Sequence, residues 1–489
     1  MGVTAIQADR EMDAGDIWAS VNFEMQPDTK STLYRGQIAN AAIEAILETI
    51  ENFQNKNFFP EPLDYKRKDV KGCWRNYMKQ TDRAIDWGQD SVATIVKKIR
   101  SADSQPGLLD TIDGEKYYLY GAHPEDKLKG NPGEIIAQRH GAICRAAVDG
   151  AVWITHLKQK KQGDRVFFKL PAAMVLGDLL KNVPEVRLSL EITSDRQTFR
   201  EIWYEESNDV GYLHFEFYNG AMNTDQCQRL RQAYLWARKR DTKVIALMGG
   251  RDFWSNGIHL NVIEASSDPA SESWQNINAI DDLVYEILTT DTHLTISALQ
   301  ANAAAGGVMM ALAADRIYAR QGIVFNPHYK RMGLYGSEYW TYSLPKRVGL
   351  EKAREITDIC MPMGTQVAKD IGLIDNYFGK DPINFQKLVK EEAEKIARSK
   401  DYQEQLWLKN KKRALDEDFK PLSQYRSQEL ERMKIDFKSE NYNTLRYNFV
   451  HKISPSNTPL HLAKHRQPVE ESLKCQVIMP KNQSKIDAA

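Results

Sequence analysis

Two glycine-containing turns between Lys243 and Tyr329 carry the residues best suited to chemistry in this chain. The first lies in KVIALMGGRDFWSNGIHL and the second in LTISALQANAAAGGVMMALAADRIYARQGIVFNPHY. In each segment an apolar, strand-like run leads into a turn of small residues that opens toward a helix. Backbone amides at such turns lack an intrahelical acceptor and are free to bind an oxygen atom. Two turns of this kind predict an oxyanion hole.

The composition of the chain excludes several classes of protein. A chain of 489 residues exceeds one ordinary core and predicts two or three domains. Equal numbers of basic and acidic residues, 66 of each, give no preference for nucleic acid. No apolar run is long enough for a membrane helix, and the first residues lack a signal pattern, so we expect a cytoplasmic protein. The five cysteines are far apart and predict neither disulfides nor a metal site.

The N-terminal segment MGVTAIQADREMDAGDIW resembles the formyltransferases that use 10-formyltetrahydrofolate. The family pattern is close to GVT-x-x-Q-M-D-x-x-x-D-T-G-D, and eight of its positions match here: Gly2, Val3, Thr4, Gln7, Asp9, Asp13, Gly15 and Asp16. The resemblance implies that Asp13 belongs to an Asn, His and Asp catalytic trio, in which a carboxylate orients the histidine. Taken alone, Asp13 could also cap a turn. The family's N-x-H segment followed by S-L-L-P is missing, so residues 1–62 are expected to form a partial formyltransferase domain.

The next segments continue this resemblance. Residues 32–53 have apolar side chains at helical spacing, and we expect this stripe to be buried. Residues 63–178 resemble the family's C-terminal domain, with turn signals at Pro132–Gly133 and Asp149–Gly150 between alternating strands. These features predict a small OB-like β-barrel. A charged, proline-containing linker is expected over residues 179–198.

From about Gly211 to Phe378 the chain resembles the crotonase family of enoyl-CoA hydratases and isomerases. AMNTDQCQRLRQA, FWSNGIHL and NAAAGGVMMALAADRIYA stand where the family has A-L-N-A-L, F-S-A-G-A-D-L and N-G-x-A-x-G-G-G-x-x-L-A-x-x-C-D. The resemblance implies an oxyanion hole formed by the amides of Ile258 and Gly306, which would polarise a thioester carbonyl. We therefore predict an α/β multidomain protein. Its crotonase domain is expected over 199–400, a helical extension over 401–454, and an extended or disordered tail over 455–489.

Two positions of this domain depart from the hydratase pattern. The family's acid/base glutamates align with Met309 and Tyr329. A methionine cannot transfer a proton, and a phenol with a pKa near 10 is a poor base at neutral pH. Addition of water to an enoyl-CoA is therefore disfavoured. The resemblance leaves a thioester-polarising hole walled by Tyr329, His328 and further aromatic side chains.

Other polar residues near these turns have more than one interpretation. His259 can pack or take part in catalysis. Glu338 is expected one turn into a helix that opens near Gly336, where a carboxylate can simply offset the helix dipole. Contacts to coenzyme A phosphates stay unassigned, with Arg251 and Lys346 as candidates.

The combination of the two modules resembles the HoxX-type hydrogenase maturation family. The resemblance implies formyl transfer from 10-formyltetrahydrofolate to coenzyme A, followed by decarbonylation of formyl-CoA in the crotonase domain, with Tyr329 positioning or shuttling the proton. The carbon monoxide would become a ligand of a nickel-iron active site. The first step is expected to fail with a partial folate domain.

Coenzyme A is the expected cofactor, joined by 10-formyltetrahydrofolate where the N-terminal domain is complete. The expected partners are a coenzyme A thioester and the hydrogenase maturation machinery, without nucleic acid or membrane. Two alternatives stay open, a crotonase-type enzyme for another acyl-CoA and a non-catalytic maturation scaffold. The sequence does not indicate an oligomeric state.

Overall fold

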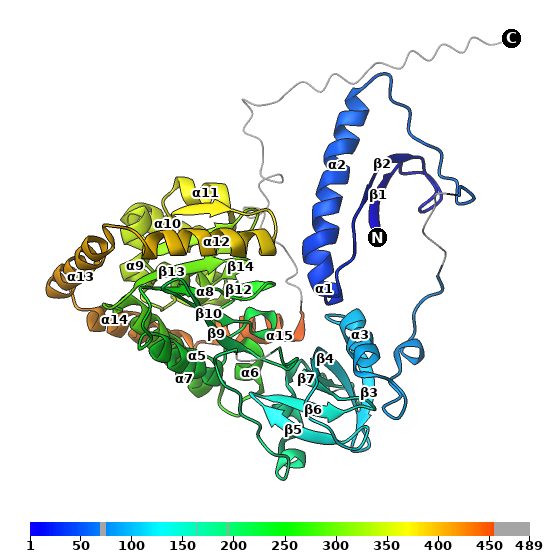
Figure 1. The fold of residues 1–489 in the computed structure, drawn as a ribbon, viewed down its shortest axis with the longest axis horizontal. Coiled ribbons are helices and arrows are strands. Elements are labelled where there is room, and N and C mark those ends of the chain that lie inside the picture. The colour runs from blue at the N-terminus through cyan, green and yellow to red at the C-terminus, as the bar shows by residue number, and fades with distance from the viewer. Residues whose placement is uncertain (69–74, 164, 193–194, 454–489) are drawn as a thin grey trace.

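The computed structural model describes residues 1–68, 75–163, 165–192 and 195–453. The tail predicted over 455–489 lies outside these residues. Figure 1 shows three parts, namely an N-terminal hairpin with a long helix, a small antiparallel domain and a larger α/β domain. Within the described ranges, no helix combines the length and apolar character needed to cross a membrane.

The N-terminal part is a hairpin covered by one long helix. Strands β1 (Gly2–Ile6) and β2 (Ile17–Asn22) pair antiparallel, and Asp13 lies in the exposed turn between them. Gly15 allows this turn to close, because a Cβ atom there would lie 1.9 Å from the carbonyl oxygen of Gln7. The helical segment follows in three continuous pieces: α1 (Lys30–Leu33), a π-helical turn (Tyr34–Ile38) and α2 (Ala39–Gln54).

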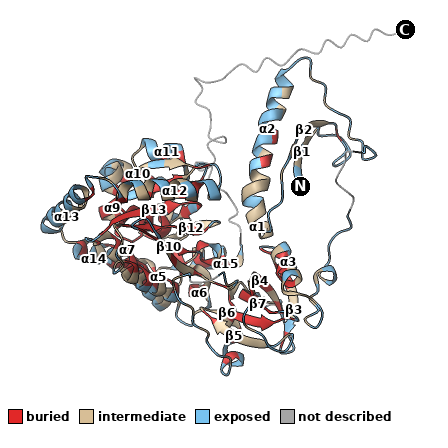
Figure 2. Cartoon of the chain, in the orientation of Figure 1, coloured by how far each residue is buried: buried red, intermediate tan, exposed pale blue. Residues whose placement is uncertain are grey.

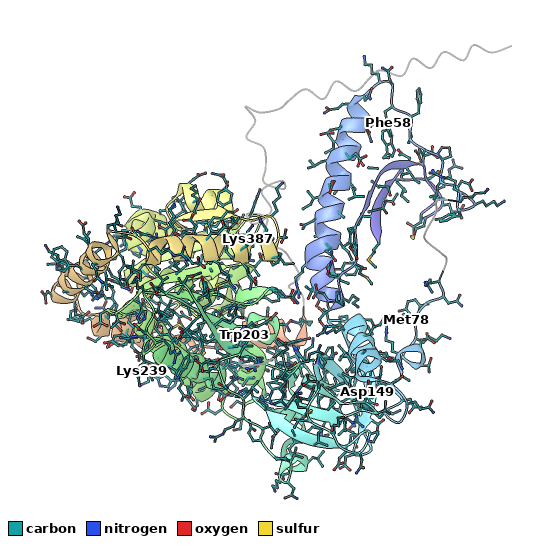
Figure 3. The ribbon with its side chains drawn as sticks, viewed as in Figure 1. Phe58, Met78, Asp149, Trp203, Lys239 and Lys387 are labelled. Carbon is teal, nitrogen blue, oxygen red and sulfur yellow. The ribbon has the colours of Figure 1, made fainter. Side chains whose placement is uncertain are left out.

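The predicted burial of the apolar stripe on this helix is wrong. Ala41 and Ala45 are buried, but Ile43, Ile46 and Leu47 are 59%, 56% and 57% exposed. The reason is geometric, because a two-stranded hairpin covers only one side of a helix. Among the described elements, β1, β2 and the preceding π-helical turn are those that pack closely against α2. The exposed side of α2 is visible in Figure 2, and its projecting side chains can be followed in Figure 3.

The small domain is an antiparallel sheet with one helix across it. The sheet order is β3-β4-β7-β6-β5, with β8 added to β7. Within the described residues no ladder joins β3 to β5, as in the partly open barrels of OB-like folds. The helix α3 begins at the cap Ser91 and buries Ile95 and Ile99 against the sheet. The elements are η2 (Thr81–Arg83), α3 (Val92–Ala102), β3 (Leu108–Ile112), β4 (Glu115–Glu125), β5 (Ile135–Arg139), β6 (Ala142–Ala146), β7 (Ala151–Gln159), β8 (Leu170–Pro171), α4 (Ala172–Leu176) and η3 (Gly177–Leu180).

The α/β domain contains two sheets. The larger has the order β18-β15-β13-β11-β10-β9 and is parallel except for the β9–β10 hairpin. The smaller has the order β12-β14-β16-β17. The strands are β9 (Ile202–Ser207), β10 (Val210–Phe215), β11 (Val244–Leu247), β12 (Phe253–Ser255), β13 (Leu294–Leu299), β14 (Asn302–Ala304), β15 (Arg316–Arg320), β16 (Val324–Asn326), β17 (Met363–Gly364) and β18 (Asn376–Phe378).

Helices cover both faces of the larger sheet. α5 and α7 pack on one face through residues such as Leu230 and Leu283, and α12 packs on the other through Phe385 and Val389. Burial on both faces explains why β11 reads as a continuous apolar run. The helical elements are η4 (Tyr218–Gly220), α5 (Thr224–Ala237), α6 (Leu260–Ala265), α7 (Pro269–Leu288), α8 (Gly306–Leu312), η5 (Tyr329–Met332), α9 (Trp340–Val348), α10 (Leu350–Ile359), α11 (Thr365–Asp370), α12 (Pro382–Ala397), α13 (Tyr402–Phe419), α14 (Leu422–Asp436) and α15 (Glu440–His451).

A buried carboxylate fastens the end of the predicted linker to the small domain. Glu125 is 1% exposed and accepts hydrogen bonds from Trp153 Nε1 at 2.9 Å, Thr198 Oγ1 at 2.5 Å and Arg196 Nη2 at 2.7 Å. Burial alone would raise the pKa of Glu125, but these donors together hold it at about 2. The charged carboxylate is therefore the form that joins the linker to the sheet.

Replacing Glu125 by Gln should lower the stability of the protein at pH 7 by about 2 kcal/mol, because a charged acceptor of several hydrogen bonds is lost. Since the folded pKa lies below the ordinary value of 4.5, the stabilisation is complete above pH 4.5 and is lost as the pH falls toward 2. Thermal unfolding of the variant and the wild type across this window measures the effect. Glu115→Gln, at an exposed position of the same sheet, is the control. Equal midpoints at pH 7 would contradict the assignment.

Candidate active site

The two predicted oxyanion donors lie at the ends of neighbouring strands. β12 leads through Gly257 to Ile258, and β14 leads to Gly306, the first residue of α8. Among the described residues, neither amide has a hydrogen-bond acceptor. Gly257 has a φ of +76°, and a Cβ atom there would lie 3.1 Å from the Gly306 nitrogen. A glycine at this position therefore lets the two turns approach each other.

Ile258 and Gly306 line a cavity of about 280 Å³ together with Tyr329 and Glu338. The rest of its lining is mostly apolar and includes Leu260, Ile277, Ala304, Ala305, Met332, Leu334, Met433 and Phe449. Three of the four predicted catalytic residues thus share one apolar cavity. Asp13 is not among its lining residues and lies in the exposed turn of the N-terminal hairpin.

Glu338 is the acidic side chain of this cavity. Its carboxyl oxygen Oε2 accepts a hydrogen bond of 2.7 Å from the Tyr329 hydroxyl. A Cβ atom at Gly306 would lie 1.9 Å from Oε1 of Glu338, so the carboxyl group packs directly against the second oxyanion turn. Glu338 is 1% exposed. The geometry places a carboxyl group beside Gly306, in the cavity that both free amides line.

The predicted helical position of Glu338 is wrong. Helix α9 begins at Trp340, and both Glu338 and Tyr339 have left-handed backbone conformations, with φ values of +60° and +57°. Such values are costly for residues other than glycine and persist only where the surroundings impose them. The carboxylate therefore does not offset a helix dipole. It is turned into the cavity by a strained loop.

Two buried carboxylates from distant helices hold this loop. Asp281 of α7 accepts hydrogen bonds of 2.8 Å from the amide of Glu338 and from the hydroxyl of Ser337. Glu429 of α14 accepts a hydrogen bond of 2.9 Å from the amide of Tyr339. The loop is thus fixed at consecutive residues from two sides.

The same arrangement places three acidic groups close together away from water. Burial and the nearby charge of Asp281 raise the pKa of Glu338 to about 8, although the hydrogen bond from Tyr329 acts in the opposite direction. Burial likewise raises the pKa of Asp281 to about 7 and that of Glu429 to about 8. Burial and the Glu338 charge raise the pKa of Tyr329 well above its ordinary value. Tyr329 therefore acts as a hydrogen-bond donor at neutral pH, and Glu338 is the group poised to exchange a proton.

Met309 and the two histidines have other surroundings. Met309 is fully buried in the core and does not line the cavity. His259 caps α6 by accepting a hydrogen bond of 3.3 Å from the Val262 amide, and burial lowers its pKa to about 4. His328 lines the cavity, but its Nδ1 lies 2.7 Å from the carbonyl oxygen of Asn326 and its pKa is lowered by burial. Both histidines are therefore neutral at pH 7.

A second cavity of about 440 Å³ adjoins the first and shares Asn256, Ile258, Leu260 and Phe449 with it. It extends to the small domain and contains the basic side chains of Lys158, Lys169 and Lys452. Lys169 Nζ donates a hydrogen bond of 2.7 Å to the Tyr218 hydroxyl, and burial lowers its pKa to about 8.

The two basic residues proposed for phosphate contacts lie elsewhere. Arg251 pairs with Asp28 at 2.9 Å, and Lys346 lines a separate cavity, where it pairs with Asp416. Neither residue lines either of the two adjoining cavities. The expectation that one of them reaches a ligand at the oxyanion hole is not supported by these positions.

Comparisons with known proteins assign both domains. Residues 206–457 match the enoyl-CoA hydratase/isomerase family, and residues 77–168 match the C-terminal domain of formyl transferases. The hydrogenase maturation factor HoxX of Bradyrhizobium diazoefficiens is 43% identical over 468 residues, which are 95% of this chain and 80% of that protein. A methionyl-tRNA formyltransferase of Geobacter metallireducens is 27% identical over 157 residues, 32% of this chain and 49% of its own length.

The crystal structure of HypX from Aquifex aeolicus in complex with tetrahydrofolic acid superposes with a TM-score of 0.90 at 44% sequence identity. The superposition covers 95% of this chain and 82% of that one. The predicted fold class, a formyltransferase C-terminal domain followed by a crotonase domain, is confirmed. The chain belongs to the HoxX/HypX family of hydrogenase maturation factors.

Proposed function

We propose that the crotonase domain of this chain splits formyl-CoA into carbon monoxide and coenzyme A, and that the carbon monoxide serves the nickel-iron site of a hydrogenase. The observation that carries the proposal is the Glu338 carboxyl group, bonded to Tyr329 and packed against Gly306 in an apolar cavity. The reaction needs one base beside an oxyanion hole. It needs no group that adds water.

The proposed reaction is balanced without a further reactant. The amides of Ile258 and Gly306 bind the formyl oxygen and polarise the carbonyl group. The Glu338 carboxylate removes the proton from the formyl carbon, and the electron pair of that C–H bond stays on carbon as the lone pair of carbon monoxide. A lone pair of the formyl oxygen supplies the third bond between carbon and oxygen. The C–S bond breaks, its electrons go to sulfur, and Glu338 returns the proton to the thiolate. No atom is oxidised or reduced by an outside agent.

The surroundings of Glu338 suit this role. A base is most effective when its pKa lies near the working pH, and burial gives Glu338 a pKa of about 8. The hydrogen bond from Tyr329 orients the carboxyl group and leaves Oε1 on the side of Gly306. The apolar lining of the cavity reduces competing hydrolysis of formyl-CoA to formate, since it offers few sites for water.

The adjoining second cavity supports coenzyme A as the carrier. Its lysines at positions 158, 169 and 452 can bind phosphate groups, and its shared wall at Ile258 leads to the oxyanion hole. A thioester would thus place its acyl end beside Glu338 and its charged end beside the small domain. We further propose 10-formyltetrahydrofolate as the formyl source, with Asp13 in the transfer step. The assays below supply formyl-CoA directly, so that they do not depend on this step.

The first prediction concerns the base. Mixing the protein with formyl-CoA should release carbon monoxide, measured by its binding to reduced haemoglobin. Glu338→Gln should lower the rate by about 100-fold or more, because general acid and base catalysis is lost. Tyr335→Phe, a nearby tyrosine that does not line the cavity, should keep the wild-type rate. No release above buffer by the wild type would refute the decarbonylase proposal, and turnover of crotonyl-CoA instead would indicate another acyl-CoA as substrate.

The second prediction concerns pH. Only the deprotonated form of Glu338 can accept the formyl proton, so kcat/KM should rise with pH around a midpoint near 8. The Tyr329 hydrogen bond stabilises the carboxylate, so Tyr329→Phe should shift this midpoint to higher pH and reduce the rate at pH 7. A variant with an unchanged profile and undiminished release would remove Tyr329 from the mechanism.

The third prediction concerns the close packing of Glu338. Gly306→Ala would place a methyl group on the Glu338 carboxyl, at 1.9 Å from Oε1, and should reduce carbon monoxide release by about 100-fold. Gly364→Ala is the matched control, because a Cβ atom there has nothing within 4 Å. Full activity of Gly306→Ala would show that Glu338 does not need its observed position.

A further inference from the structure

A third cavity, of about 520 Å³, lies where parallel strands of the larger sheet begin, whereas the oxyanion turns lie beyond the ends of these strands. Its wall includes the first residues of two parallel strands, Leu294 of β13 and Arg316 of β15. The third cavity shares no lining residue with the two cavities of the candidate active site. A ligand here would not contact the proposed thioester.

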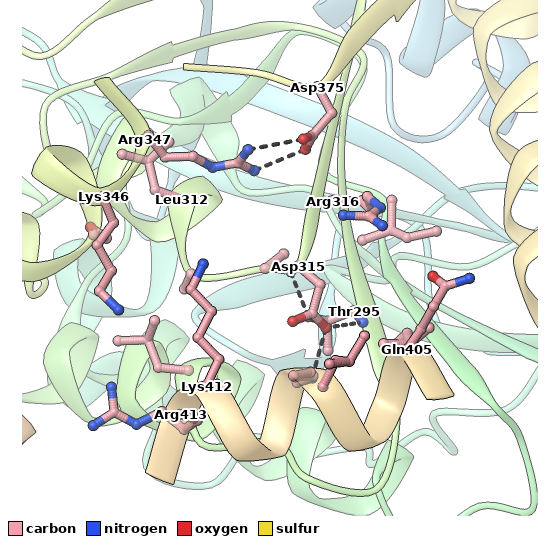
Figure 4. A pocket seen from close by; sticks show the side chains of 18 of the residues that line it. Thr295, Leu312, Asp315, Arg316, Lys346, Arg347, Asp375, Gln405, Lys412 and Arg413 are labelled. Carbon is pink, nitrogen blue, oxygen red and sulfur yellow. Dashed lines mark hydrogen bonds and ion pairs between the residues drawn. The ribbon is translucent and has the colours of Figure 1, made fainter. Parts of the chain in front are cut away.

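The charged lining of this cavity has an excess of cations. Six basic side chains and three carboxylates line it: Arg316, Lys346, Arg347, Lys409, Lys412 and Arg413, with Asp315, Asp375 and Asp416. Arg316 lies on β15, and Lys346 and Arg347 lie on α9. One side of α13 contributes Lys409, Lys412, Arg413 and Asp416. Figure 4 draws most of the lining side chains. The electrostatic potential inside the cavity therefore favours an anion.

Each of the three carboxylates is already neutralised by a partner. Asp315 pairs with Lys409 at 2.7 Å and accepts two hydrogen bonds from Thr295. Asp375 binds Arg347 through two hydrogen bonds of 2.9 and 2.8 Å. Asp416 pairs with Lys346 and accepts a hydrogen bond of 2.9 Å from Tyr342. These pairs fix the walls of the cavity, and the charge of Arg316 also acts on Asp375 from a greater distance.

Lys412 and Arg316 are the cations left over. Within the described part of the chain, neither side chain has an ion pair or a hydrogen bond, and both side chains are exposed. Figure 4 shows the Lys412 side chain extending from its helix into the cavity, with Arg316 on the other side of Asp315 in this view. Two exposed cations without a partner, on the wall of one cavity whose other charges are paired, are free to bind an anionic group.

The apolar lining residues would contact the uncharged part of a ligand. Leu294, Leu312 and Ile396 give the cavity an apolar wall beside the cations. The volume lies in the range of small-molecule sites and exceeds what an inorganic anion needs. We propose that this cavity binds a phosphorylated small molecule of about nucleotide size, with its phosphates on Lys412 and Arg316 and its less polar body on the apolar wall.

Calorimetric titration of the full chain with ADP and with pyrophosphate tests the site. Both probes should bind the wild type, ADP more tightly, and the double substitution Lys412→Gln, Arg316→Gln should weaken both by at least about tenfold, the loss expected for two charged contacts. Lys411→Gln is the matched control. It is the adjacent lysine of α13, does not line the cavity and lies over the ring of Trp407.

The outcomes separate the site from general attraction to a basic surface. Unchanged affinity in the double variant, or an equal loss in Lys411→Gln, would overturn the proposal. Pyrophosphate that binds as tightly as ADP would overturn the assigned apolar wall. Carbon monoxide release from formyl-CoA should be the same in all three proteins without ADP, because the variants lie outside the candidate active site.

Discussion

The exclusion of water from Glu338 is the constraint on which the candidate active site depends. A carboxyl group in an apolar cavity resists ionisation, and Asp281 and Glu429 nearby increase this resistance. Asp281 and Glu429 also accept the backbone hydrogen bonds that hold Glu338 in place. One pair of side chains thus fixes the position of the proposed base and adds to the proton affinity that burial gives it. A simple apolar cavity would raise the proton affinity but would not hold the carboxyl group in place.

This constraint explains the architecture around it. The loop at Ser337 to Tyr339 has backbone conformations that the chain would not adopt unaided, and they persist because α7 and α14 supply acceptors from opposite sides. The helices beyond residue 401 are therefore part of the site as well as its cover, since α14 carries Glu429. The enoyl-CoA hydratase/isomerase match agrees with this, because it extends to residue 457.

The sequence predicted those features that depend on local chain geometry. Strand, small-residue turn and helix succeed one another within a few residues around Ile258 and Gly306, so the two turns could be recognised from spacing alone. Glu338 could not be placed in this way, because its conformation depends on Asp281 and Glu429, which lie far from it in the sequence. A signal was present in GLYGSEYWTYSL, where one acidic residue stands among apolar and aromatic neighbours. The stripe on α2 was misjudged for the opposite reason, since periodicity shows which side of a helix is apolar and not whether anything covers it.

For the proposed thioester, the raised pKa of Glu338 would also link binding to proton exchange with the solvent. Near pH 8 this carboxyl group is protonated in only part of the molecules. A thioester oxygen held at Ile258 and Gly306 brings partial negative charge close to it, which favours the protonated state. Binding would then take up a fraction of a proton from the buffer, and the measured heat would depend on the ionisation enthalpy of that buffer. The burial of Glu338 would thus be detected as proton uptake on binding, which calorimetry measures without any turnover.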